Sequence, residues 1–242
     1  MTGKNPGEAR LAVLIDADNA RAQYLDQLVV ELAKYGRASV RRAYGDWTSN
    51  QLSAWKAQLL QHSIQPMQQF SYTTGKNATD SALIIDAMDL LHAGNLDGFC
   101  IVSSDSDFTR LAGRIREQGL RVYGFGERKT PQPFVAACDT FVYLENLAGE
   151  QAPKPVAAAP QLTRDATLDR LLAEAVEAAS DDDGWARLSG VGSNLSRLAS
   201  DFDPRTWGFR KLKDLFDAHP LYELRSRLTG EGKTPHAYVR HV

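Results

Sequence analysis

The stretch Ile101-Val102-Ser103-Ser104-Asp105-Ser106-Asp107-Phe108 joins an apolar run to two acids that are spaced by one residue. Apolar residues then repeat at helical spacing, at Phe108, Leu111, Ala112 and Ile115. This pattern predicts a buried strand, a tight polar turn and an outgoing helix. Asp105 and Asp107 would therefore lie at the carboxyl end of a strand, which is where open α/β sheets bind their ligands.

A second stretch near the start of the chain, Leu11-Ala12-Val13-Leu14-Ile15-Asp16-Ala17-Asp18-Asn19, has the same arrangement of apolar run and acids. A continuous apolar run is typical of a parallel strand that is buried on both faces. If these two strands lie side by side in one parallel sheet, their acids converge at the same edge. The remaining pattern of the chain indicates whether such a sheet is expected.

Apolar strand patterns alternate with helical patterns through the first 147 residues or so. Strands are expected over 11–15, 38–44, 64–70, 99–103, 120–125 and 140–144. Such alternation predicts an α/β fold with a doubly wound parallel sheet and right-handed crossovers. In a 3-2-1-4-5 strand order, the first and fourth strands are neighbours at the topological switch point. Asp16 would then lie within reach of Asp105 and Asp107.

The composition of the chain divides it into two domains and a linker. Residues 1–148 form the predicted α/β domain, and residues 149–162 contain three prolines and no hydrophobic period, as in an extended linker. Residues 163–242 have helical patterns, among them a helical region over Trp185–Leu198 that we expect to be broken at Gly190 and Gly192. A stretch similar to a recognition helix, Trp207–Phe216, and a closing hairpin complete a small winged-helix module.

Overall composition is that of an ordinary globular protein, with 43% apolar residues and a net charge of −2. Nothing global indicates a nucleic-acid or membrane partner, although a nuclease needs only a local basic surface. Cys100 and Cys138 show no zinc or disulfide spacing. Residues 1–10 lack the apolar core of a signal peptide, and no run reaches the ~18 apolar residues of a membrane helix. We therefore expect a cytoplasmic protein with no membrane association.

Four acids occur at predicted junctions into helices: Asp16, Asp80, Asp105 and Asp107. Carboxylates that lie close together repel one another, and a hard divalent cation such as Mg²⁺ or Mn²⁺ removes that repulsion. A metal at this edge could activate water and stabilise charge on a phosphate, which is the chemistry of a metal-dependent phosphodiesterase. Phosphate contacts are expected from side chains near the acids, at Lys76, Ser104 and Arg110.

Each of these acids also has a simpler interpretation as a helix cap, because Asp commonly follows a buried strand for that reason. We expect Asp46 to be a turn residue, and Asp86 and Asp89 to be solvated or paired. An Asp-x-Asp pair after an apolar strand also occurs in haloacid-dehalogenase-type phosphatases, where the first Asp is a nucleophile. Asn19-Ala20 follows the pair here instead of the usual Thr or Val, which weakens that match.

Three blocks of the sequence resemble the NYN domain family, the LabA-like branch of the PIN-like ribonucleases: Leu14–Asn19, Lys76–Asp80 and Ser103–Phe108. The resemblance covers about residues 10–147. It implies a Rossmann-like PIN fold and a ribonuclease dependent on Mg²⁺ or Mn²⁺. Carried over to this chain, the resemblance assigns the acids of the family to the four positions named above. The asparagine of the first block, Leu14–Asn19, falls on Asn19.

Residues from about 163 to 242 resemble an OST-HTH (LOTUS) domain, a winged-helix family linked to RNA binding. The resemblance rests on Trp185, on the Leu188–Leu198 helix and on Trp207-Gly208-Phe209-x-x-Leu212. From Arg205 to Val242 there are eight Lys and Arg against four acids, a net charge of +4, which suits phosphate contacts. The basic side chains that we expect to contact RNA follow Phe209, at Arg210, Lys211 and Lys213.

The sequence as a whole therefore predicts a metal-dependent endoribonuclease with a C-terminal RNA-binding domain. Two alternatives stay open at this point. One is a non-catalytic RNA-binding adaptor, whose C-terminal domain could instead bind a protein, and the other is a phosphatase.

Overall fold

The computed structural model describes residues 9–70, 78–148, 165–227 and 235–242. The chain divides into two compact units, Met1–Gln151 and Ala152–Val242, and each is described by itself. Lys76, predicted to contact phosphate, lies outside the described residues.

The first unit contains a six-stranded sheet in the order β3-β2-β1-β4-β5-β6, and all five pairs of neighbours are parallel. This confirms the predicted α/β class and strand order. β1 and β4 are hydrogen-bonded neighbours, with Leu11 opposite Gly98 and Ile15 opposite Val102. The strands are β1 (Arg10–Asp16), β2 (Arg37–Gly45), β3 (Gln65–Gln68), β4 (Gly98–Val102), β5 (Arg121–Gly126) and β6 (Thr140–Tyr143).

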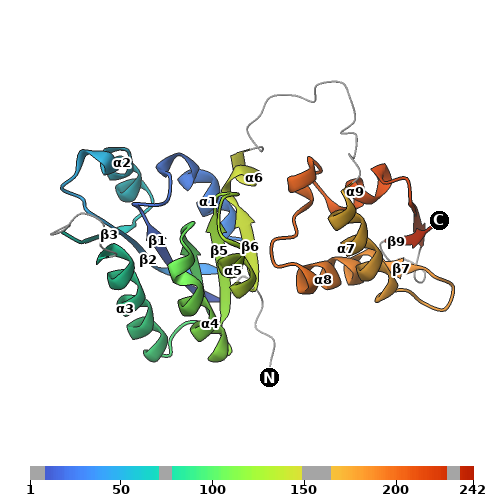
Figure 1. Cartoon of the computed structure of the whole chain (residues 1–242), viewed down its shortest axis with the longest axis horizontal. Helices are drawn as coiled ribbons and strands as arrows, with labels where there is room; N and C mark the ends of the chain where they lie inside the picture. Colours follow the sequence, from blue (N-terminus) through green and yellow to red (C-terminus); the bar gives the residue numbers. More distant parts are fainter. Residues whose placement is uncertain (1–8, 71–77, 149–164, 228–234) are drawn as a thin grey trace. The chain divides into compact units, whose positions relative to one another are not determined.

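Helices cover both faces of this sheet (Figure 1). One face packs against α1 (Leu25–Leu32), α2 (Ser53–Gln61) and α6 (Leu144–Ala148). The other packs against α3 (Ala78–His92), α4 (Thr109–Glu117) and α5 (Gln132–Ala137). Short 3₁₀ turns precede three of these helices, at Ala22–Tyr24, Asn50–Leu52 and Ser106–Phe108.

Strand β1 is buried on both faces, which explains why its sequence is a continuous apolar run. Leu11, Val13 and Ile15 pack on the α1 side, whereas Ala12 and Leu14 pack on the α3 side. Because side chains alternate along a strand, Asp16 points to the α3 side. The same alternation in β4 carries Ser103 to that side, since Phe99 and Ile101 pack there. The pleat thus directs both polar residues toward the helix that carries Asp80.

The second unit packs three helices against a three-stranded antiparallel sheet in the order β7-β9-β8. The predicted closing hairpin is confirmed as the β8–β9 pair. The unit's fully buried residues include Leu172, Leu195, Phe216 and Val239. Its elements are α7 (Ala166–Glu177), β7 (Ala186–Arg187), α8 (Leu188–Leu198), the 3₁₀ turn Pro204–Trp207, α9 (Leu212–Ala218), β8 (Tyr222–Arg227) and β9 (His236–His241).

Two sequence predictions in this unit are wrong in detail. Gly190 and Gly192 do not break a helix, because α8 runs without interruption through both. Helix α8 packs into the core of the unit through Val191 and Leu195, and this packing overrides the low helix propensity of the two glycines. The helical region also begins later than predicted, since Trp185 precedes β7 and lies outside α8.

The stretch predicted as a recognition helix divides at Gly208, whose φ of +82° ends the 3₁₀ turn in the left-handed region that favours glycine. Helix α9 begins only at Leu212, so Arg210 and Lys211 precede it. Leu215 and Phe216 face the core as predicted. Within the described residues, no helix has the length and apolar content needed to cross a membrane.

Candidate metal centre

Asp16, the last residue of β1, is fully buried and is held by two neighbours. Its Oδ2 accepts hydrogen bonds from Ser103 Oγ at 2.7 Å and from Asn19 Nδ2 at 2.9 Å, and its Oδ1 accepts from the Asn19 backbone N–H at 3.3 Å. Burial raises the pKa of Asp16, and these hydrogen bonds oppose that rise because they favour the charged carboxylate. The end of β1 therefore carries a fixed carboxyl group in a polar cradle.

Three further acids come together beside the ends of β1 and β4. Asp80, Asp105 and Asp107 each offer a carboxylate oxygen, and these oxygens all lie within 4.8 Å of one another. Asp80 comes from the first turn of α3, and the other two come from the turn between β4 and α4. We call this group the carboxylate cluster. The convergence at one sheet edge that the sequence predicts is therefore observed for residues from separate elements.

The exposure of the cluster changes from one side to the other. Asp80 is buried, Asp105 is half-buried and Asp107 is exposed. Asp105 also caps the 3₁₀ turn that precedes α4, because its Oδ1 accepts from the Asp107 backbone N–H at 3.0 Å. Capping uses one oxygen of Asp105, so the cap and the cluster are compatible interpretations of the same residue.

The acids act on one another electrostatically, and the pKa of Asp80 shows it most clearly. Burial and neighbouring negative charges together raise this pKa from 3.8 to about 6, with burial the largest cause, followed in order of weight by the charges of Asp16, Asp105, Asp107 and Asp18. The described neighbours that raise the pKa of Asp80 most are therefore all acids. A bound cation would offset this repulsion, and the donor set consists of carboxylate oxygens, which Mg²⁺ and Mn²⁺ prefer.

Asp18 connects the β1 end to the start of α3 without belonging to the three-residue cluster. It is exposed, and its Oδ2 accepts a hydrogen bond from Thr79 Oγ1 at 2.8 Å. Thr79 directly precedes Asp80, so this contact helps to fix the helix start that carries the buried acid. Asp18 is thus a link between two site elements.

The other predicted site residues divide into those near the acids and those elsewhere. Asn19 binds Asp16 as described. Ser104 accepts a hydrogen bond from the Glu127 backbone N–H at 2.9 Å, which ties the β4 turn to the end of β5. Arg110 is exposed in the first turn of α4. Arg210, Lys211 and Lys213 are exposed in the second unit.

Two features of this edge were not singled out from the sequence. Ser103 donates to Asp16 and accepts from the Asp105 backbone N–H at 3.1 Å, so it joins both acidic strands. Glu127 is buried directly after β5 and forms ion pairs with Arg21 at 2.7 Å and Lys129 at 3.0 Å. The signal for Glu127 was present, since it follows an apolar strand as Asp16 does.

Asp86, six residues beyond Asp80 on α3, has a structural role. It accepts hydrogen bonds from the Arg42 guanidinium and the Tyr44 hydroxyl, both of which come from β2. It is therefore a paired residue, one of the two expected possibilities. Asp46 accepts from Thr48 Oγ1 at 2.5 Å and from Gln68 Nε2 at 2.9 Å, as a turn residue would.

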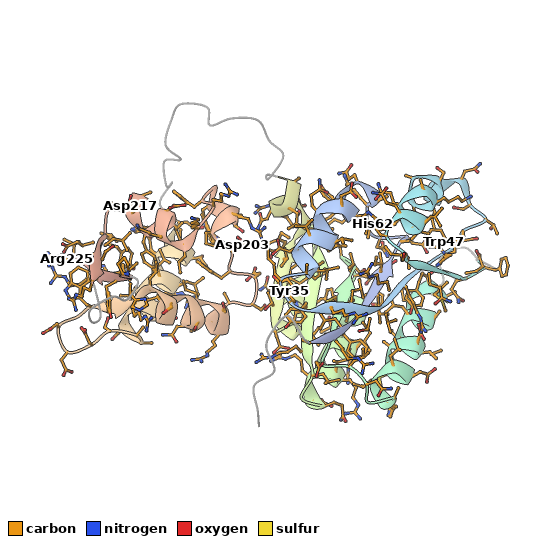
Figure 2. The ribbon with its side chains drawn as sticks, turned by 180° about the vertical axis from the view of Figure 1, so that it is seen from behind. Tyr35, Trp47, His62, Asp203, Asp217 and Arg225 are labelled. Atoms are coloured by element: carbon orange, nitrogen blue, oxygen red, sulfur yellow. The ribbon has the colours of Figure 1, made fainter. Side chains whose placement is uncertain are left out.

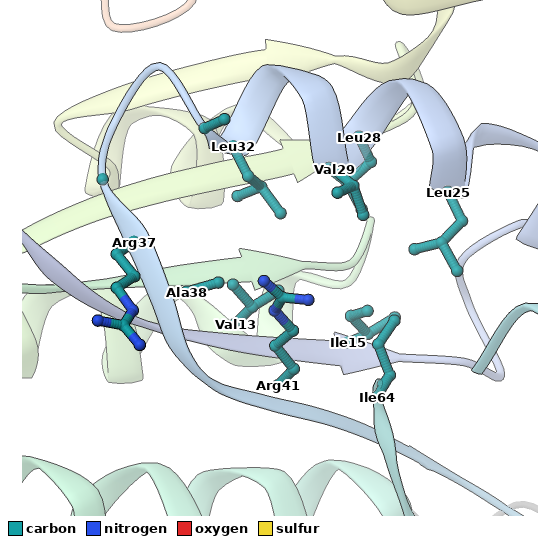
Figure 3. A pocket seen from close by; sticks show the side chains of 12 residues that line it. Val13, Ile15, Leu25, Leu28, Val29, Leu32, Arg37, Ala38, Arg41 and Ile64 are labelled. Atoms are coloured by element: carbon teal, nitrogen blue, oxygen red, sulfur yellow. The ribbon is translucent and has the colours of Figure 1, made fainter. Parts of the chain in front are cut away.

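A separate apolar pocket of about 230 Å³ lies between α1 and the neighbouring strands β1 and β2. Its lining includes Val13, Leu28 and Leu32, and Arg41 extends into it from β2 (Figure 3). The pocket shares no residue with the carboxylate cluster. The chemistry of the acids is therefore located at the sheet edge and not in this pocket.

Comparison with known proteins agrees with this geometry. The model of the NYN domain matches residues 10–145, and the model of the OST-HTH/LOTUS domain matches residues 163–234. A search among curated proteins finds no match. The NYN match ends close to the last helix of the first unit, and it includes all four acids and Asn19.

Solved structures of bacterial proteins also resemble parts of the chain. A protein of unknown function from Vibrio parahaemolyticus is 19% identical, with a TM-score of 0.49 over 58% of this chain and 96% of its own. An uncharacterised protein of Nitrosomonas europaea is 35% identical, with a TM-score of 0.31 over 38% of this chain and 88% of its own. A protein from Chromobacterium violaceum is 30% identical, with a TM-score of 0.27 over 34% of this chain and 86% of its own.

The family match covers more than half of the chain, and the strand order and acidic edge were established independently of it. The resemblance inferred from the sequence blocks is thereby confirmed for both units. The chain belongs to the NYN domain family, and its second unit contains an OST-HTH/LOTUS domain.

Proposed function

We propose that this protein is an endoribonuclease that hydrolyses RNA phosphodiesters with Mg²⁺ or Mn²⁺. NYN domains are part of the PIN-like nuclease superfamily, and OST-HTH/LOTUS domains imply RNA binding. The observation that carries the proposal is the carboxylate cluster, where oxygens from α3 and from the β4 turn lie within 4.8 Å of one another. Among the described residues, the charges named as raising the pKa of Asp80 are all negative.

In this proposal Asp80, Asp105 and Asp107 hold the metal, and Asp16 completes the acidic set. A divalent ion bound there would supply an activated water and would stabilise charge on the phosphate. Asn19 and Ser103 orient the Asp16 carboxylate through the hydrogen bonds described above. We assign phosphate contacts to Arg110 and to Lys76.

The burial of Asp16 favours this proposal over a phosphatase with Asp16 as nucleophile. Asp16 is 0% exposed, and both of its carboxylate oxygens accept hydrogen bonds. A nucleophile must reach the phosphorus atom in line with the leaving group, and a buried carboxylate in such a cradle has no free approach. The geometry suits a carboxylate that acts through a metal.

The test compares Asp105→Asn with Asp89→Asn, because Asp89 is an exposed acid on α3 outside the cluster. Labelled single-stranded RNA is incubated with each protein and Mn²⁺, and EDTA serves as the metal-free control. We expect the Asp105 variant to lose at least about 100-fold in cleavage rate, which is about 2.7 kcal/mol of transition-state stabilisation. The Asp89 variant should cleave as the wild type does.

Unchanged cleavage by the Asp105 variant would overturn the assignment of the site. Intact RNA after incubation of the wild type with either metal, together with measurable RNA binding, would identify the adaptor alternative instead. Turnover of a phosphomonoester with a covalent intermediate on Asp16 would identify the phosphatase.

A further inference from the structure

One face of the β7-β9-β8 sheet carries an unusual concentration of arginine. Tyr222, Leu224 and Val239 point to the core, so the alternate residues of β8 and β9 point away from it. Residues directly opposite one another share a face, and Arg225 pairs with Tyr238 while Tyr238 also pairs with Arg187. We call this outer surface the arginine face; it consists of Arg187, Glu223, Arg225, Arg227, His236, Tyr238 and Arg240.

The arginines are layered on aromatic rings. The guanidinium carbons of Arg225, Arg227 and Arg240 lie 4.9, 5.0 and 4.8 Å from the ring centre of Trp185, and Arg227 lies 5.1 Å from that of Tyr238. All four cation–π contacts in the described part of this unit therefore belong to one surface. Trp185 itself is only 4% exposed, so the guanidinium groups are the atoms that meet the solvent.

Acids compensate this charge only in part. Glu223 pairs with Arg225 at 2.7 Å and with Arg240 at 3.0 Å, and Asp181 approaches Arg227 at 4.0 Å. Among the described residues, four arginines thus face two carboxylates. The side chains of Arg225, Arg227 and Arg240 keep 57%, 39% and 40% of their surface exposed, which leaves them accessible to a ligand. Arg225 is labelled on this unit in Figure 2.

We propose that the arginine face is the surface through which the second unit binds single-stranded RNA. Guanidinium groups donate to phosphate oxygens, and their planes, like the Tyr238 ring, offer stacking partners for unpaired bases. This inference rests on the proposed RNA substrate and adds its binding surface. The surface differs from the one expected from the sequence, which placed RNA contacts at Arg210, Lys211 and Lys213.

The α9 region fits RNA less well than the arginine face does. Helix α9 has seven residues, and Asp214 and Asp217 are exposed on it close to Lys211 and Lys213 (Asp217 is labelled in Figure 2). These acids place negative charge beside the two lysines. Lysine also lacks the planar fork with which arginine binds a phosphate through two hydrogen bonds while stacking on a base.

The experiment measures the binding of a fluorescein-labelled, mixed-sequence 12-nucleotide RNA to the full chain by fluorescence anisotropy. EDTA prevents cleavage, so the result is independent of catalysis. The double variant Arg225→Gln/Arg227→Gln is compared with the α9 variant, Lys211→Gln/Lys213→Gln, which removes the same charge from α9 and the residue before it. Arg225→Lys/Arg227→Lys retains the charge and removes the planar groups. Thermal unfolding monitored by circular dichroism verifies that each variant folds.

We expect the arginine-to-glutamine variant to bind about tenfold more weakly and the α9 variant to change less than about twofold. If both arginines contact phosphates, the slope of log affinity against log salt should become shallower by about 1.4, because each contact on a single strand contributes about 0.7. The arginine-to-lysine variant should keep the wild-type salt slope and still bind more weakly, because stacking is lost.

Equal or greater weakening by the α9 variant would overturn the proposal and move the RNA surface to α9. Unchanged RNA binding by the arginine-to-glutamine variant would also overturn it and would assign the arginine face to a protein partner. Neither result bears on catalysis, since Mn²⁺-dependent cleavage is tested by the Asp105 variant. The two proposals can therefore fail separately.

Discussion

The carboxylate cluster and the arginine face assemble their charges in different ways. The cluster takes single residues from the ends of separate elements, and a parallel sheet brings these ends to one edge. The arginine face takes alternate residues from paired strands, and an antiparallel register brings them to one surface. In the carboxylate cluster, the order of the strands determines which residues meet. On the arginine face, the register of the paired strands determines it.

The two regions also differ in how their charges are balanced. Asp80 is surrounded by other acids, and its pKa is raised to about 6. The arginines lie over aromatic rings and next to Glu223, whose pKa is lowered by hydrogen bonds and charge from Arg225 and Arg240. A site of like charges is relieved by a proton or by a bound cation, whereas a partly compensated surface is suited to reversible contacts. The cluster should therefore bind metal strongly, and the arginine face should bind RNA with strong salt dependence.

The largest expected effect is the loss of metal binding when Asp80 is changed. Asp80→Asn removes the buried ligand, and we expect Mn²⁺ affinity to fall by about 100-fold or more in isothermal titration calorimetry, because a neutral amide replaces a carboxylate. Asp89→Asn on the same helix is the control and should bind as the wild type does. Equal Mn²⁺ affinity of both variants would show that the cluster is not a metal site.

A smaller effect is expected from Ser103→Ala, which removes the hydroxyl that joins Asp16 to the Asp105 backbone. Groups that orient a metal ligand typically contribute about 10- to 100-fold, and we expect about tenfold weaker Mn²⁺ binding here. Ser104→Ala is the matched control, because Ser104 Oγ binds only the Glu127 backbone among the contacts described above. If the two variants weaken Mn²⁺ binding equally, Ser103 has no special role in the site.

Ser103 and Ser104 show which parts of the site can be predicted from the sequence. The acids were predictable because each follows an apolar strand or opens a helix, and strand order then brings them together. The choice between Ser103 and Ser104 depends on which face of the pleat each side chain occupies. Ser104 was expected to contact phosphate, whereas the structure shows Ser103 next to Asp16. Two neighbouring serines differ only in the face of the sheet to which each side chain points. At the end of a strand, the apolar pattern is a weak guide to that face.

The second unit contains a feature that the sequence could not predict. Its hairpin and the buried residues of α9 were predicted from apolar spacing. The basic side chains expected to contact RNA, however, were placed after Phe209, where they are contiguous in the sequence. Arg187, Arg225 and Arg240 are far apart in the sequence and meet only through the β7-β9-β8 register. Trp185, assigned to a helical region, lies beneath Arg225 and Arg240 instead. Long-range register is not encoded in any local pattern, so this surface required the structure.

The raised pKa of Asp80 predicts that the metal-free protein becomes less stable as the pH rises. Its folded pKa of about 6 exceeds the ordinary 3.8, so the folded state holds the proton more tightly than the unfolded state does. The contribution to stability is complete below about pH 4 and is lost as the pH rises through about 6. Thermal unfolding in EDTA should show Asp80→Asn gaining a few degrees relative to the wild type at pH 7.5 and no gain at pH 4.

Adding Mn²⁺ should reverse this difference, because only the wild type can bind the ion through an ionised Asp80. The melting temperature of the wild type should then rise above that of Asp80→Asn at pH 7.5. A constant difference between the two proteins from pH 4 to pH 7.5, in EDTA, would contradict the raised pKa.

The smallest expected effect is a gain in RNA binding when Glu223 is neutralised. Glu223 is the acid on the arginine face, and it pairs with Arg225 and Arg240, which must release it to bind phosphate. Glu223→Gln should tighten RNA binding about threefold at low salt, since Arg225 and Arg240 no longer have to release an exposed, weakly held acid before they bind phosphate. Asp214→Asn on α9 is the matched control and should leave affinity unchanged.

Because removing either acid adds the same net charge, a general electrostatic effect would tighten binding in both variants equally. Only RNA bound at the arginine face predicts that Glu223→Gln binds more tightly while Asp214→Asn does not, and the reverse result would locate the RNA at α9.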